Sequence, residues 1–173
     1  MVMGNLVHTS TVLLRRSRLE QVGGFDETPR PVGEDFDFHL RTCRAGPLAF
    51  ADVASIECRI GREDQLTRPE LSILMAHAFL KTIEPLARDG GRGIDMPSSM
   101  VQSVRAEAHA WIGRESLAHG DRRAARKHLA ESLRVRALVP STLPFFALSC
   151  GRDATFPVAR QVVRVAKRVV RQR

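Results

Sequence analysis

The stretch "VRAEAHAWIGRESLAHGDRRAARKHLAESLRVR", residues 104–136, predicts two helices separated by a tight turn. The pattern is helical on both sides of Gly120-Asp121, and glycine and aspartate are typical turn residues. Helical spacing continues through the rest of the chain, so we expect everything from residue 100 onward to be helical.

The hairpin resembles a single tetratricopeptide unit. Small or apolar residues stand where such a unit needs them, at Gly113, Gly120, Ala125, Leu129 and Leu133. One unit cannot bury its own apolar face, and three or more are normally needed. We therefore expect this repeat-like hairpin to pack on another part of the chain.

Two further segments define the expected domain organisation. A longer helix is predicted over residues 69–87, and "RDGGRGIDMPSS", residues 88–99, is the clearest linker because glycine and proline interrupt it repeatedly. The chain is thus divided into a module over 1–87, a linker over 88–99, and a helical hairpin with a basic amphipathic tail over 100–173.

Charge is distributed unevenly between the two halves. Residues 1–100 carry 12 basic and 14 acidic side chains, a net −2, whereas residues 101–173 carry 15 and 5, a net +10. In the tail, 156–173, valines at helical spacing alternate with arginines and lysine, which suits either a solvated helix face or an anionic membrane surface. Nucleic acid is a less suitable partner, because aromatic residues are only 5% of the chain and tyrosine is absent.

The composition indicates a cytoplasmic protein that could be peripheral on a membrane. No apolar stretch approaches the ~20 residues of a membrane span, and "MVMGNLVHTS" lacks the basic region of a secretory signal. The three cysteines, Cys43, Cys58 and Cys150, are far apart and show no paired metal spacing.

The first half predicts a mixture of strands and helices, and hence an α+β fold. Residues 6–14 and 48–60 are rich in aliphatic and β-branched residues and are expected to form strands. A short helix is expected between Arg15 and Gly23, with Ser17 and Glu20 as a capping box. Residues 34–45 are expected to form another helix, with Phe36, Leu40 and Cys43 on one face.

Glu34, Asp35 and Asp37 lie together at the start of that helix. The positive end of the helix dipole stabilises carboxylates there, which is sufficient reason for an acidic helix start. A rigid, ionised carboxylate at the mouth of a cleft is also what a general base requires. The residues alone leave helix capping and catalysis both open.

The order of motifs resembles the family-two glycosyltransferases, inverting enzymes of the GT-A type that use nucleotide-sugars. The similarity runs from residue 4 to about 68. It comprises an apolar stretch, "LLRRSRLEQVGGFDE", a loop, "EDFDFHLR" and "GPLAFADVASIECRI". The resemblance implies a partial GT-A-like α/β module with sugar transfer from a nucleotide-sugar to an acceptor hydroxyl.

The resemblance also implies roles for particular residues. Asp35 matches the general base that deprotonates the acceptor hydroxyl, and Glu34 would support it. Gly24, Phe25 and Asp26 match the loop beside the acceptor site, and Asp37 shares the helix of the base. The donor substrate would be a nucleotide-sugar.

Two departures from the family qualify this expectation. The nucleotide-binding half has no counterpart among these residues, nor has its DxD motif, which holds the divalent metal, Mn²⁺ or Mg²⁺. "DFD" at 35–37 matches the base motif and not the metal motif. We therefore expect a truncated glycosyltransferase or, as an alternative, a non-catalytic interaction or membrane-surface module derived from one.

Overall fold

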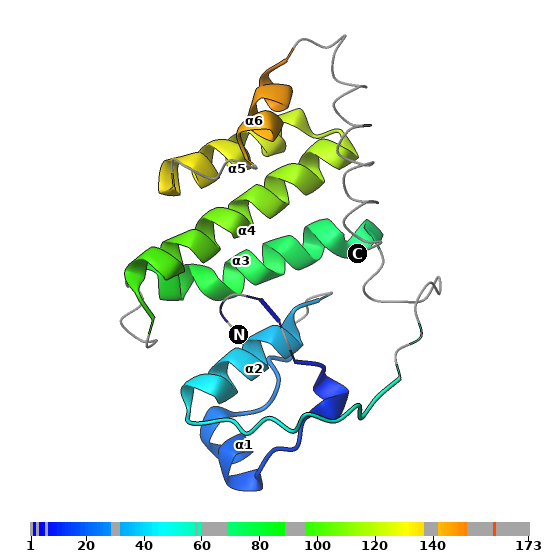
Figure 1. Ribbon diagram of the computed structural model, residues 1–173, viewed down its shortest axis with the longest axis vertical. Helices are drawn as coiled ribbons and strands as arrows, with labels where there is room; N and C mark the ends of the chain where they lie inside the picture. The colour runs from blue at the N-terminus through cyan, green and yellow to red at the C-terminus, as the bar shows by residue number, and fades with distance from the viewer. Residues whose placement is uncertain are drawn as a thin grey trace.

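A computed structural model describes residues 2, 4, 5, 7–28, 32–57, 59, 69–88, 96–136, 142–151 and 161. Its regular elements are six α-helices and two short 3-10 helices, arranged in layers (Figure 1). In chain order they are η1 (Thr9–Thr11), α1 (Arg16–Val22), α2 (Glu34–Arg44), η2 (Pro69–Leu71), α3 (Ser72–Arg88), α4 (Ser98–His119), α5 (Arg122–Val135) and α6 (Leu143–Cys150).

The predicted α+β fold is wrong, because the described residues contain helices and no strand. Where strands were expected, residues 7–14 contain only η1, and residues 48–57 form no regular element. Large apolar side chains in these segments stay in solvent, with Leu13 fully exposed and Phe50 90% exposed. A strand is stable only when its backbone groups pair with a neighbouring strand, and no such neighbour lies among the described residues.

The helical hairpin is confirmed and forms the centre of the fold. Gly120 ends α4 in the left-handed conformation, at φ 94° and ψ 1°. Asp121 begins α5, and its side chain accepts a hydrogen bond from the Ala124 amide at 2.9 Å. A two-residue turn therefore places α4 and α5 side by side (Figure 1).

Gly113 permits the close approach of the two hairpin helices. A β-carbon added there would lie 2.5 Å from Cγ of Leu129, and Leu129 itself is fully buried. The small residue that the tetratricopeptide-like pattern requires at this position is thus explained by packing.

Two apolar clusters stabilise the layers. The first joins α2, α3 and α4, and its fully or largely buried members are Val2, Phe36, Leu40, Ile83, Val104 and Ala108. The second joins α4 and α5 to α6, and consists of Leu117, Ala118, Ala125 and Leu129, with Phe145, Phe146 and Leu148 against them. The first cluster includes side chains from both sides of the expected linker at 88–99. The hairpin therefore packs on α3, as expected for a single repeat-like unit that cannot bury its own apolar face.

The remaining local predictions have mixed outcomes. The helices expected over 34–45 and 69–87 are confirmed as α2 and α3. The capping box is wrong: Arg15 is the N-cap of α1, and no side chain caps that helix. Gly23 ends α1 with a positive φ of 76°. Most of the linker, residues 89–95, and all of the tail except Gln161 lie outside the described residues.

Candidate functional site

The acidic helix start is positioned by Gly33. This glycine is the N-cap of α2, with φ 92° and ψ 6°, and a β-carbon on it would lie 2.7 Å from Cβ of Ala78 on α3. Only glycine suits both the left-handed backbone and the close approach. Consequently α2 begins against α3, with Glu34, Asp35 and Asp37 in its first turn.

The Asp35 carboxylate is engaged locally. Its Oδ1 accepts a hydrogen bond from the Phe36 amide at 2.7 Å, and its Oδ2 accepts one from the Asn5 side chain at 3.2 Å. The residue is half-buried. These bonds satisfy a helix-start amide and fix the direction of the carboxylate, which is the role expected of an acidic residue in a first turn.

His39 lies one helical turn after Asp35 and is buried, with Nε2 3.1 Å from the hydroxyl of Thr9. Burial lowers the pKa of His39, and the negative charge of Asp35 partly opposes that effect. The imidazole therefore connects η1 to α2 as a neutral group.

Gly24, Phe25 and Asp37 are brought together by Arg41 and by an aromatic contact. Arg41 on α2 donates hydrogen bonds to the carbonyls of Val22 and Gly24 and pairs with Asp37 at 2.9 Å. The ring of Phe25 stacks on that of Phe38, with 4.4 Å between centroids. The glycine-rich loop is thus attached to α2 through Arg41 and Phe38.

Asp26 and Glu34 are the other predicted site residues. Asp26 accepts a hydrogen bond from the Thr28 amide at 2.9 Å and closes its own turn. Glu34 is half-buried in the first turn of α2. Within the described ranges, no group of three or more histidine, cysteine, aspartate or glutamate side chains could hold a metal ion.

A second candidate site, which was not predicted from the sequence, lies on α5. A shallow groove of about 510 Å³ is lined by Arg122, Arg123, Arg126, Lys127 and Ala130. Four of the five lining residues are cationic and none is acidic. We call this feature the cationic groove.

Part of the cationic groove is held in place by α6. Arg126 donates to the Ser149 carbonyl at 3.0 Å, and Arg122 donates to the Gly151 carbonyl. These carbonyls lie at the C-terminal end of α6, where guanidinium groups are favourable. Arg123 and Lys127 are exposed, so the groove presents both fixed and solvent-facing cations.

The spacing of the four cations is a signal that sequence reasoning could have used. Positions 122, 123, 126 and 127 are i, i+1, i+4 and i+5, which form two adjacent rows on one helix face. Only the basic tail, residues 156–173, was considered as a binding surface from the sequence, so the cationic groove was missed.

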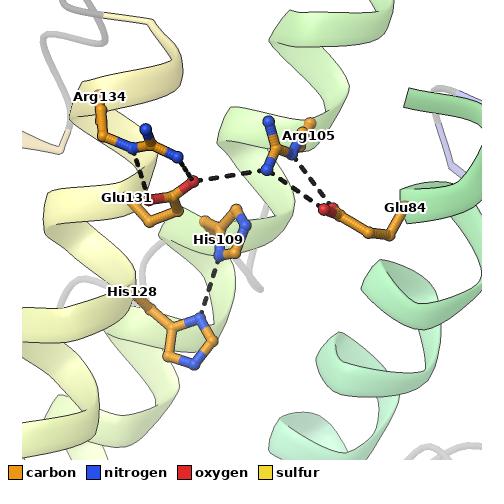
Figure 2. Close-up of polar contacts among 6 residues, drawn as sticks. All are labelled: Glu84, Arg105, His109, His128, Glu131 and Arg134. Atoms are coloured by element: carbon orange, nitrogen blue, oxygen red, sulfur yellow. Dashed lines mark hydrogen bonds and ion pairs between the residues drawn. The ribbon is translucent and has the colours of Figure 1, made fainter. Parts of the chain in front are cut away.

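A polar network crosses from α3 over α4 to α5 (Figure 2). Arg105 on α4 donates to both carboxylate oxygens of Glu84 on α3, at 3.1 and 3.2 Å, and pairs with Glu131 on α5 at 3.4 Å. Arg134 holds Glu131 at 2.8 Å, and this hydrogen bond lowers the pKa of Glu131. Beside the ion pairs, Nδ1 of His109 lies 3.1 Å from Nδ1 of His128.

None of the helices in the described ranges is long and apolar enough to cross a membrane. No protein-family model, curated protein or solved structure matches the chain. The resemblance to the family-two glycosyltransferases therefore stays a prediction from the motifs.

Proposed function

We propose that this chain is a non-catalytic module, derived from a glycosyltransferase, that docks on an anionic membrane surface through the cationic groove of α5. The observation that carries the proposal is the groove itself, in which Arg122, Arg123, Arg126 and Lys127 line one hollow without a carboxylate.

The position of these cations within α5 supports a binding role. All four lie in the first six residues of the helix. The N-terminal end of a helix is already partially positive, so each cation in the first turn costs about 0.3–1 kcal/mol of helix stability. The four cations lower the stability of α5, but they concentrate positive charge on one surface. Such a surface attracts an anionic ligand.

The neighbouring helix suits a lipid surface better than an acidic protein or a nucleic acid. α6 contains no charged residue, and its exposed residues, Leu143, Pro144, Ala147 and Cys150, recur at roughly helical spacing. Because Arg126 contacts the end of α6, an uncharged helix lies directly beside the groove. Apolar and cationic surfaces side by side are typical of elements that bind at a membrane interface.

Co-sedimentation with lipid vesicles tests this proposal. The full chain should pellet with vesicles of phosphatidylcholine and phosphatidylserine, but not with phosphatidylcholine alone, and salt should weaken the association. Each basic residue near an anionic surface contributes about 1 kcal/mol. The double variant R123Q/K127Q should therefore lose roughly 30-fold in partitioning.

The matched control removes two exposed cations elsewhere, in the variant R16Q/K81Q, and should change partitioning little. A chain lacking residues 156–173 separates the groove from the tail. If the tail deletion abolishes pelleting while R123Q/K127Q pellets like the parent chain, the groove is not the docking surface.

Sugar transfer is the second candidate function. One observation favours it: the Asp35 carboxylate is fixed in direction by the Phe36 amide and is only half-buried. The family resemblance implies that catalysis would need a nucleotide-binding half and a divalent metal. Calorimetry with a nucleoside diphosphate and Mn²⁺ or Mg²⁺ is the test, and the absence of heat at millimolar ligand would argue against donor binding by this chain.

A further inference from the structure

Three histidines gather where α3, α4 and α5 meet. His109 on α4 is 8% exposed, and its Nδ1 lies 3.1 Å from Nδ1 of His128 on α5. His77 on α3 completes the group, with its ring edge-on to that of His128 and 5.6 Å between centroids. We call these three residues the histidine cluster.

The two facing nitrogens of His109 and His128 can share only one proton. When both rings are neutral, one Nδ1–H donates and the other Nδ1 accepts. A first added proton leaves that hydrogen bond possible, because a charged ring still donates. A second added proton places N–H groups on both facing nitrogens, so the bond is lost and two charges face each other.

The charged groups around the cluster would not balance positive charges on both His109 and His128. Glu84 on α3 and Glu131 on α5 favour a positive His109, but Arg105 on α4 and Arg134 on α5 oppose it. His128 faces His109, His77 and Lys127, all of which disfavour its charge, and only Glu131 favours it. Both carboxylates are also paired with Arg105 (Figure 2).

Burial is the main cause of the resulting pKa shifts. It lowers the pKa of His109, and together with the neighbouring cations and histidines it lowers the pKa of His128 from 6.5 to about 4. His109 and His128 are therefore neutral at pH 7 in the folded chain, whereas an unfolded chain would take up protons near pH 6.5.

We propose that the histidine cluster is an acid-sensitive contact, which holds α5 against α3 and α4 while the facing rings of His109 and His128 are neutral and releases α5 as these two rings are protonated. The lowered pKa values set the direction. The stability that the contact contributes is fully present above pH 6.5, and the part that depends on His128 is lost progressively as the pH falls from 6.5 to about 4. This inference does not depend on what the cationic groove binds.

Urea unfolding of the full chain at pH values from 7.5 to 4 tests the proposal. The parent chain should lose stability on acidification, and H128Q, whose amide stays neutral throughout, should lose less. Between pH 7 and pH 4, we expect the unfolding constant of the parent chain to rise at least about tenfold more than that of H128Q. The control H8Q, which removes an exposed histidine outside the cluster, should follow the parent chain. Equal losses in H128Q and the parent chain would overturn the proposal.

A second measurement remains decisive if H128Q does not fold. NMR titration of the histidine ring protons in the parent chain should show His128 titrating well below the ordinary value of 6.5. Amide exchange, corrected for intrinsic rates, should accelerate in α5 more than in α2 as the pH is lowered. A His128 titration at the ordinary value near 6.5 would rule out the acid-sensitive contact.

Discussion

Gly113 shows how one residue sets the distance between two helices. A methyl group in its place would lie 2.5 and 2.8 Å from side-chain carbons of Leu129 and 3.2 Å from the Leu129 backbone nitrogen. Because both residues are buried, neither helix can yield without disturbing the second apolar cluster. We expect G113A to lower the free energy of unfolding by about 1–3 kcal/mol, measured by urea denaturation at pH 7.

Gly24 provides the matched control for that substitution. No atom lies within 4 Å of an added β-carbon there, and its φ is not in the positive range. G24A should therefore change the unfolding free energy by less than about 0.5 kcal/mol. Because alanine is favoured over glycine inside a helix, a loss in G113A points to the contact with Leu129. A similar loss in both variants would contradict this explanation.

The residue scale is also where the candidate site was least predictable. The sequence placed Glu34, Asp35 and Asp37 correctly at a helix start, because capping depends on neighbours in the chain. The residue types alone left capping and catalysis both open for Asp35, because the partners of its carboxylate depend on the fold, and one of them, Asn5, is thirty positions away. The hydrogen bond from Arg41 to the Gly24 carbonyl also joins residues that are distant in the chain. The residue types alone could not predict it.

At the scale of elements, helices were predicted well and strands were not, for one physical reason. A helix satisfies most of its hydrogen bonds within itself, so its apolar spacing is sufficient to predict α2, α3, α4 and α5. A strand needs a partner, and strand-like composition indicates only that a segment could pair if a sheet were present. Residues 7–14 and 48–57 have that composition without a sheet among the described residues.

The segment 48–57 leads to a prediction about association. Phe50 and Val53 are 90% and 67% exposed, so they contribute little to the folded core. We expect F50S/V53S to leave the melting temperature within about 2 °C of the parent chain, because surface substitutions change stability little. The variant should also self-associate less at high concentration, measured by light scattering, because exposed apolar patches promote association.

The control for this prediction is F36A, which alters a side chain that is only 4% exposed in the first apolar cluster. Its loss should be about 3–5 kcal/mol, as for other buried phenylalanines. If F50S/V53S instead unfolded as F36A does, the segment would be part of the core in solution.

At the scale of the whole molecule, two apolar clusters are connected by polar contacts. The first cluster joins α2, α3 and α4, and the second joins α4, α5 and α6. The helix α4 belongs to both, and Arg105 extends from it to Glu84 on α3 and to Glu131 on α5 (Figure 2). The sequence predicted that the hairpin would pack on another part of the chain. It did not predict that Arg105 would pair with carboxylates of both α3 and α5.

Arg105 therefore provides a test of how the layers are coupled. Its side chain is 22% exposed, and those of Glu84 and Glu131 are 20% and 26% exposed, so water screens these ion pairs only in part. R105A leaves Glu84 facing Glu131 without the cation between them, and should cost about 2 kcal/mol in urea unfolding.

R114A provides the comparison, because Arg114 pairs with Glu107 on the same helix and Glu107 is 56% exposed. Its cost should be about 0–1 kcal/mol. Combining R105A with E84Q should cost less than the sum of the two single variants, because both changes remove the same Arg105–Glu84 ion pair. Equal losses in R105A and R114A, or strict additivity with E84Q, would mean that apolar packing alone connects α3 to the hairpin.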